Sequence, residues 1–300
     1  MKQIKKNLLT MTAILLCGGI LSCSDDSDVP GEDNTPKEMD VQVTTSSVLT
    51  KALVTGEYLS DRESIGVKLV DATNSTYDGL SFDNIKYTAS GVGTSQKWEA
   101  ASTVLLSSTI GTVYAYYPYK DGTDITNISI SSGQTDFMYG FATGVTNATA
   151  TANVKLNHAL VAIKAKIIKG DYTAKAELTD ISIVSTGLAT NASLNAMTGA
   201  LTKIQGANTN INWNGTQTLQ GSSTDILLAG VPTAATNPSI KFSLTIDGAK
   251  YNINSTYTGS YIPGNVYEYT LTLNGKELLL TGITVSTWKI EDKGSLAPMP

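Results

Sequence analysis

The chain has 300 residues, a formal net charge of −5, and 21 basic against 26 acidic residues. An acidic chain with scattered lysines lacks the basic surface that nucleic acids bind, so nucleic acid is not an expected partner. The chain has one histidine and two cysteines, and both cysteines lie near the N-terminus. The ligand spacings of a zinc site are therefore absent, and no metal or cofactor is expected.

Residues 1–22 have the pattern of a secretory signal, with lysines ahead of an apolar run. The run from 8 to 21 is shorter than the roughly 20 apolar residues that cross a bilayer comfortably. It ends in a sequence that resembles a bacterial lipobox, in which the small Ser22 precedes Cys23. We expect cleavage between these two residues and lipid, including palmitate, on Cys23. Cys17 follows a large residue and is the competing candidate.

Residues 23–40 are polar, acidic and punctuated by proline, which predicts a flexible tether. The letters SDDSD directly after Cys23 resemble the signal that sends lipoproteins to the outer face of the bacterial outer membrane. The expected location is therefore the cell surface, with the anchor in outer-membrane lipid.

Beyond residue 40 apolar residues alternate with polar ones between turn residues, which predicts an all-β protein. Residues 240–246 alternate most clearly, and Asp247-Gly248 is typical of a two-residue hairpin turn. Residues 141–153 are small and polar without a strong apolar period, so we interpret them as a connection. The prediction is an N-terminal β-sandwich over 41–152 and a C-terminal β-sandwich over 153–300.

Catalytic patterns are missing from the sequence. The single histidine, His158, heads an alternating segment and is interpreted as a structural residue, and no nucleophile elbow or phosphate-binding loop accompanies it. We therefore expect no enzyme and no catalytic residues. Tyr114 and Tyr116 share one face of a tyrosine-rich segment, where they are candidates for an aromatic ligand surface or for ordinary packing.

Five segments together resemble the fimbrillin family, the type V pilus subunits of Bacteroidales. They are YAYYPY at 114–119, TDFMYG at 135–140, VKLNHALVAIKAKI at 154–167, GNVYEYTLTL at 264–273 and ELLLTGITVSTW at 277–288.

The resemblance implies two tandem transthyretin-like β-sandwich domains and a function in assembly. A family member reaches the surface as a lipoprotein, and a protease then cuts after a basic residue that follows the first strand. The strand leaves, and a strand from another subunit fills the apolar groove. The implied partners are other pilus subunits, and the implied location after processing is the fimbrium.

At the implied cut this sequence has Lys51-Ala52, whereas family members often carry arginine. The resemblance therefore implies processing after Lys51, with Arg62 as the alternative. Lys51 could also be a solvated residue that is never cut.

We expect the strand that this chain would donate to another subunit to lie near the C-terminus. Residues 278–290, with Ile283, Val285 and Ile290, are the candidate, although they could form the last strand of their own domain. Shaft and tip positions both stay open, and host or bacterial surface ligands are candidate partners. The alternative function is a cell-surface glycan-binding lipoprotein of a polysaccharide-uptake system.

Overall fold

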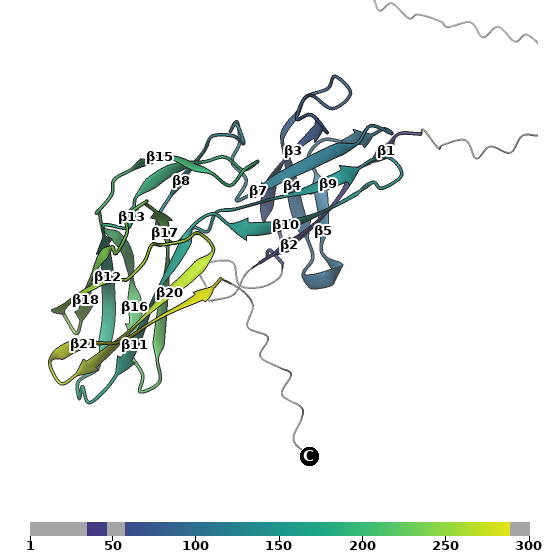
Figure 1. Ribbon diagram of the computed structural model, residues 1–300. Coiled ribbons are helices and arrows are strands. Elements are labelled where there is room, and N and C mark those ends of the chain that lie inside the picture. The colour runs from purple at the N-terminus through teal and green to yellow at the C-terminus, as the bar shows by residue number, and fades with distance from the viewer. Residues whose placement is uncertain (1–34, 47–57, 289–300) are drawn as a thin grey trace, which may run out of the picture. The chain divides into compact units, whose positions relative to one another are not determined.

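The computed structural model describes residues 35–46 and 58–288. In this part of the chain the regular elements are β-strands apart from one 3-10 turn, η1 (Gly93–Ser95), which confirms the all-β prediction. Figure 1 shows the strands gathered into several sheets. None of the described segments contains a helix of the length and apolarity needed to cross a membrane.

The first sheet has seven strands, coloured purple to teal in Figure 1. Their spatial order is β2 (Asp40–Thr45), β10 (Thr151–His158), β9 (Met138–Val145), β7 (Gly111–Tyr117), β3 (Ser64–Asp71), β4 (Phe82–Ser90) and β5 (Lys97–Ala100). β2 runs parallel to β10, and the other neighbouring pairs are antiparallel. The end strands β2 and β5 contact each other. The sheet therefore curls around its own core.

Alternation explains how this core forms, because successive side chains of a strand point to opposite faces. On β7, Val113 and Ala115 point inward, and on β3 Val67 and Leu69 do the same. A short pair, β1 (Lys37–Glu38) with β6 (Leu105–Leu106), lies beside the sheet and adds the buried Leu106.

The second half of the chain forms a sandwich of two further sheets. One contains β13 (Leu188–Ala189), β17 (Thr224–Pro232), β11 (Val161–Lys169), β20 (Asn265–Asn274) and β21 (Glu277–Thr287). The other contains β16 (Ile211–Thr218), β12 (Glu177–Ser185), β18 (Ser239–Ile246) and β19 (Ala249–Thr256). Side chains of both sheets share one core, in which Phe242 of β18 packs on Tyr269 of β20 with ring centroids 5.0 Å apart.

The predicted hairpin turn at Asp247-Gly248 is confirmed. Ile246 pairs with Ala249, which leaves these two residues as the whole loop. Both have positive φ, 49° and 78°. This is the backbone of a type I′ turn, whose twist matches that of the flanking strands.

The interpretation of 141–153 as a connection is wrong, because β9 and β10 occupy most of it. Ala152, Val154 and Leu156 of β10 point into the first core, and the polar Asn153 and Lys155 between them face outward. The proposed boundary at 152/153 falls inside β10, which stays in the first sheet to His158. A further sheet of three strands, β15 (Leu201–Gln205), β14 (Asn191–Leu194) and β8 (Ile128–Ser131), pairs segments from both halves.

Gly140→Ala should destabilise the first sheet. A methyl group at Gly140 would lie 2.2 Å from the backbone carbonyl oxygen of Lys155 on β10, so one of the two strands must shift. We expect a loss of about 1–3 kcal/mol in the free energy of unfolding, measured by denaturant titration. Gly221→Ala is the matched control, because nothing lies within 4 Å of its added methyl group. Equal stability of the two variants would contradict the close approach of β9 and β10.

Candidate functional site

The first strand of the first sheet, β2, occupies the outer edge of β10. Val41 pairs with Ala152, Val43 with Val154 and Thr45 with Leu156 in a parallel register. Backbone bonds continue the ladder at both ends, from Asp40 N–H to Ala150 O at 2.9 Å and from Ser46 N–H to Leu156 O at 3.0 Å. β2 therefore satisfies main-chain groups that would otherwise form an open edge.

β2 also covers the first core with its inward face. Val41 is 0% exposed and Val43 is 3% exposed, and both contact the same core as Met39 just before the strand. Burying each of these side chains contributes roughly 1.5–3 kcal/mol. Removing the strand would therefore uncover an apolar slot together with the unpaired edge of β10.

The residues ahead of β2 tie it to the same region. Met39 N–H donates to Val104 O at 2.9 Å, and the Asn147 side-chain amide donates to Thr35 O at 3.1 Å. Below the strand, burial raises the pKa of Tyr87, and the negative charges of Glu38 and Asp40 raise it further. The Tyr87 phenol is therefore neutral over the ordinary pH range.

Several predicted site residues lie outside the described part of the chain. They are Ser22, Cys23, Lys51, Ala52 and Ile290. Arg62 is described, and its side chain is 91% exposed. Its backbone is nevertheless tied to β4, because Arg62 N–H donates to Ala89 O at 2.9 Å while Ala89 N–H donates to Glu63 O at 2.8 Å.

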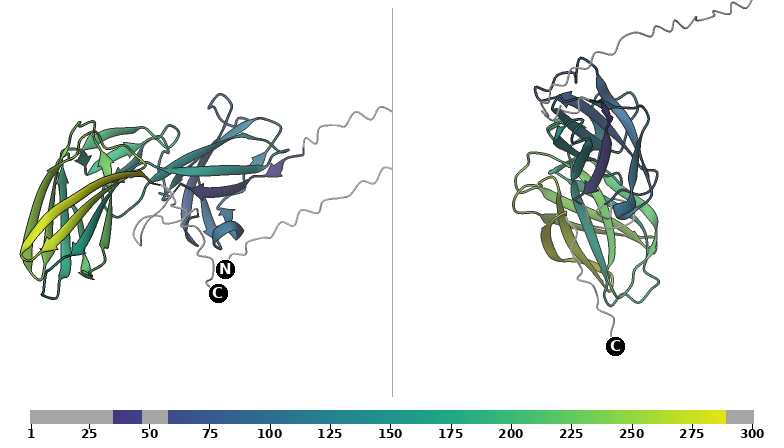
Figure 2. Two further views of the ribbon diagram at one scale, coloured as in Figure 1. Left: turned by 60° about the horizontal axis from the view of Figure 1, so that its bottom comes forward. Right: turned by 90° about the vertical axis from the view of Figure 1, so that its right-hand side faces the viewer.

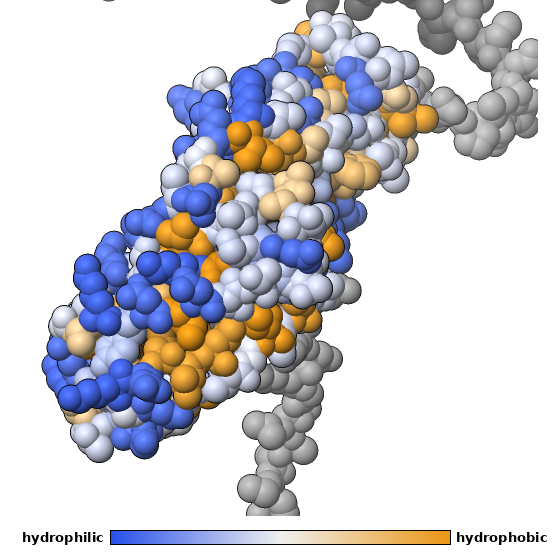
Figure 3. Space-filling model, turned by 60° about the vertical axis from the view of Figure 1, so that its left-hand side comes forward, coloured by the Kyte–Doolittle hydropathy of each residue, from blue (hydrophilic) through white to orange (hydrophobic). Residues whose placement is uncertain are grey.

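The two described donor-strand candidates, Ile283 and Val285, lie in β21. This strand pairs with β20 along its length and forms an edge of its sheet. Ile283 packs against the core of the second half, whereas Val285 and Leu279 are exposed. Apolar residues gather over the lower part of the face shown in Figure 3. Donating Ile283 and Val285 to another subunit would require β21 to leave β20.

The aromatic surface predicted from Tyr114 and Tyr116 needs a correction. Tyr116 is 0% exposed, and its hydroxyl donates to Asn84 Oδ1 at 2.8 Å, so this ring lies inside the protein. Later segments, including β8, cover the outer face of β7 at this point. Tyr114 is half-buried and contacts Phe141, which is 57% exposed on β9. The sequence pattern does not identify Phe141 as a surface aromatic residue, because residues 141–153 are interpreted there as a connection.

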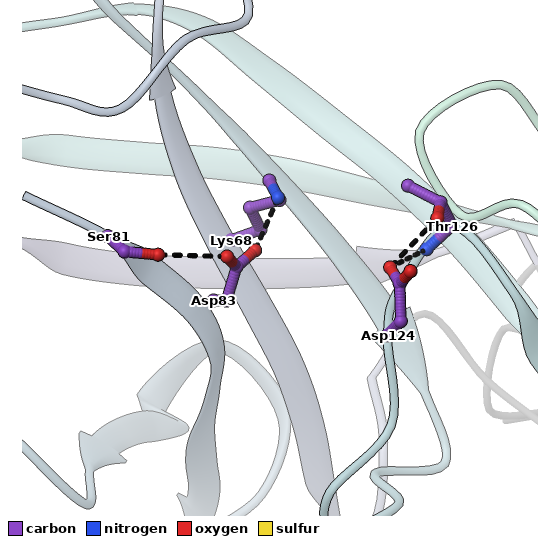
Figure 4. A network of polar contacts seen from close by, with 5 residues as sticks. All are labelled: Lys68, Ser81, Asp83, Asp124 and Thr126. Carbon is purple, nitrogen blue, oxygen red and sulfur yellow. Dashed lines mark hydrogen bonds and ion pairs between the residues drawn. The ribbon is translucent and has the colours of Figure 1, made fainter.

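Figure 4 shows two groups of polar contacts among Lys68, Ser81, Asp83, Asp124 and Thr126. Lys68 of β3 forms an ion pair with Asp83, which also accepts a hydrogen bond from Ser81 Oγ at 2.9 Å. Nearby, the Thr126 backbone N–H and hydroxyl lower the pKa of Asp124, and the charge of Lys68 adds to this effect.

His158 takes part in a buried cluster at the end of β10. Its Nδ1 lies 2.8 Å from Asp136 Oδ2, and both side chains are 1% exposed. Trp288 stacks on the imidazole with centroids 3.8 Å apart and planes 5° apart. A substrate cannot reach so closed a pair, and the geometry fits a structural role. Among residues 35–46 and 58–288, no three His, Cys, Asp or Glu side chains gather to hold a metal ion.

Comparisons with known proteins place the fold. The profile of the fimbrillin-like family matches residues 50–288. A candidate cell adhesion protein of Bacteroides ovatus is similar at 18% identity and a TM-score of 0.65, over 86% of this chain and 100% of that one. One from Bacteroides uniformis has 18% identity and a TM-score of 0.63, over 84% and 98%. One from Bacteroides fragilis has 13% identity and a TM-score of 0.52, over 84% and 97%. No curated protein matches the sequence.

Val43→Ala should destabilise the protein, whereas Thr44→Ala should not. Val43 points into the first core and the neighbouring Thr44 is exposed, so both variants keep the backbone pairing of β2 and only Val43→Ala removes core coverage. We expect about 2 kcal/mol lost for Val43→Ala, measured by thermal unfolding of the mature chain. Unchanged stability of Val43→Ala would mean that β2 does not contribute to the fold.

Proposed function

This chain belongs to the fimbrillin-like family, and we propose that it is a subunit of a bacterial surface pilus, assembled by removal of β2 and entry of a strand from another subunit. The observation that carries the proposal is the position of β2. Among the strands of residues 35–46 and 58–288, it is an edge strand whose backbone pairs only with β10, and the family match begins at residue 50, after this strand has ended.

An incoming strand would meet two complementary features at this edge. Its main chain would pair with β10 between Thr151 and Leu156, as β2 does. Its alternate side chains would enter the slot that Val41 and Val43 fill. Strand addition of this kind combines main-chain hydrogen bonds with side-chain pockets. The candidate donor segment is residues 278–290, which include Ile283 and Val285 of β21 and Ile290.

Processing after Lys51 fits this arrangement better than processing after Arg62. A protease binds its substrate as an extended segment, and Arg62 has a φ of 66° and backbone bonds to β4 on both sides of the scissile bond. Cutting there would also disturb the entry to β3. Cutting after Lys51 would release β2 and leave the ladder between β3 and β4 intact.

The N-terminal leader supports a location at the outer membrane. Lipidation of Cys23 would anchor the chain in outer-membrane lipid before processing, and the acidic tether would separate the first sheet from the membrane. Release of the tether and β2 in one piece would then free the remaining subunit for the fimbrium. The role is structural, with other pilus subunits as partners.

A lysine-specific protease should convert the purified mature protein into one stable product that begins at Ala52. We expect the product, and not the uncut protein, to form a ladder of oligomers on size-exclusion chromatography, because only the product exposes the edge of β10. Mass spectrometry and N-terminal sequencing identify the cut.

Two variants control this experiment. Lys51→Gln should stay uncut and monomeric, whereas Arg62→Gln should be cut and assemble like the unmodified chain. A product that begins at Glu63 would move the processing site to Arg62. Assembly by Lys51→Gln without any cut would show that β2 removal is not required.

Cys23→Ala should abolish membrane attachment in cells that export lipoproteins. We expect the unmodified chain to incorporate labelled palmitate and to sediment with the outer membrane, and the variant to lose both. Cys17→Ala is the matched control and should behave as the unmodified chain does. Loss of labelling in the Cys17 variant alone would overturn the assignment of the anchor.

A further inference from the structure

Three loops that are distant in sequence meet at the end of the second sandwich. They follow β11, join β18 to β19, and join β20 to β21, and Figure 1 shows the β20–β21 turn at that end. Together they line an open hollow of about 710 Å³. Its lining residues are Asp171, Tyr172, Thr173, Ala174, Ala249, Lys250, Tyr251, Gly275 and Lys276. This volume lies within the usual range of small-molecule sites, about 300–1,000 Å³.

Two aromatic rings are fixed in the wall of this hollow. Tyr172 and Tyr251 are half-buried and pack against the core of the second half. The Tyr172 hydroxyl donates to Asp247 Oδ2 at 3.0 Å. Desolvation, together with the hydrogen bonds to Asp247 and Tyr251, raises the pKa of Tyr172 to about 12. Tyr172 is therefore a neutral phenol in a set position at physiological pH.

The two carboxylates near the hollow, Asp171 and Asp247, already accept hydrogen bonds from backbone N–H groups. Asp247 accepts hydrogen bonds from the backbone N–H groups of Glu177 at 2.8 Å and Ala176 at 2.9 Å, and these bonds lower its pKa. Asp171 accepts from the backbone N–H of Gly275 across the hollow. These bonds hold the loops together and leave fewer free acceptor positions on the carboxylate oxygens for lysine side chains.

The lysines at the rim have no such partner. Lys250 and Lys276 are exposed, and neither has an ion pair in the described part of the chain. Two ammonium groups without an ion-pair partner thus stand beside two tyrosines. Their charges offset those of the Asp171 and Asp247 carboxylates, so the hollow is less acidic than the whole chain, whose formal net charge is −5.

We propose that this hollow binds an acidic sugar, a pyranose that carries a carboxylate. The apolar face of the sugar ring would lie against Tyr251, and the Tyr172 hydroxyl would provide a hydrogen-bonding group at the ring edge. The carboxylate would accept charge-assisted hydrogen bonds from Lys250 and Lys276. A neutral sugar lacks the group that these two lysines would bind. The inference is independent of β2 and of its removal, because no residue of the first sheet lines the hollow.

The test is titration calorimetry of the mature chain with matched oligosaccharides. We expect binding of probes that end in glucuronic acid or N-acetylneuraminic acid, and at least tenfold weaker binding of neutral probes with the same linkage. Raising the salt concentration should weaken the acidic probes selectively, because the lysines are exposed to solvent.

Variants assign the binding to this hollow. The double variant K250A/K276A should lose at least tenfold in affinity, and Tyr251→Ala should also bind weakly. Lys241→Ala is the matched control, since Lys241 is an exposed lysine on β18 away from the hollow, and it should bind as the unmodified chain does. Unchanged melting temperatures would exclude misfolding of the lysine variants. Equal binding of neutral and acidic probes, unchanged binding by the double variant, or binding only of acidic peptides would overturn the proposal.

Discussion

An edge strand must satisfy two demands at once, and the first half of this protein depends on how β2 meets them. Its backbone completes the ladder of β10, and its inward side chains complete the core. A strand that supplies both can be replaced by any strand of matching pattern, because sheet pairing is specified by alternation more than by sequence. The same physical requirement stabilises the isolated chain and, in the assembly that we propose, would provide the attachment point for another chain.

Much of the fold could be predicted from local pattern. The segment around Phe242 alternates strictly and ends in Asp247-Gly248, so its hairpin could be predicted from neighbouring residues alone. The start of β10, residues 151–153, could not, since its one inward residue is the small Ala152, which gives a weak apolar signal. Pairing of residues 40–45 with 151–156 joins segments more than 100 residues apart, and no local pattern specifies such a partner.

The candidate sites show the same contrast between what local sequence pattern predicts and what depends on distant segments. Alternation put Tyr114 and Tyr116 on one face, but burial depends on what covers that face, and β8 and its neighbours bury Tyr116 fully and Tyr114 only in part. His158 could be interpreted as structural from its position in the sequence. Its partners could not be predicted, because Asp136 lies just before β9 and Trp288 just after β21, far apart along the chain. The hollow with Tyr172 and Lys276 combines three separate loops, so only a three-dimensional arrangement reveals it.

The parallel direction of β2 has a consequence for the symmetry of an assembly. Parallel and antiparallel ladders place their hydrogen bonds differently, so a replacement strand that keeps this ladder must run in the same direction as β2. Each subunit would then present one kind of surface to the subunit before it and another kind to the subunit after it. Such heterologous contacts build an open filament when the rotation between subunits does not close a ring. A filament of this kind has two chemically different ends, and growth at one end would leave the other unchanged.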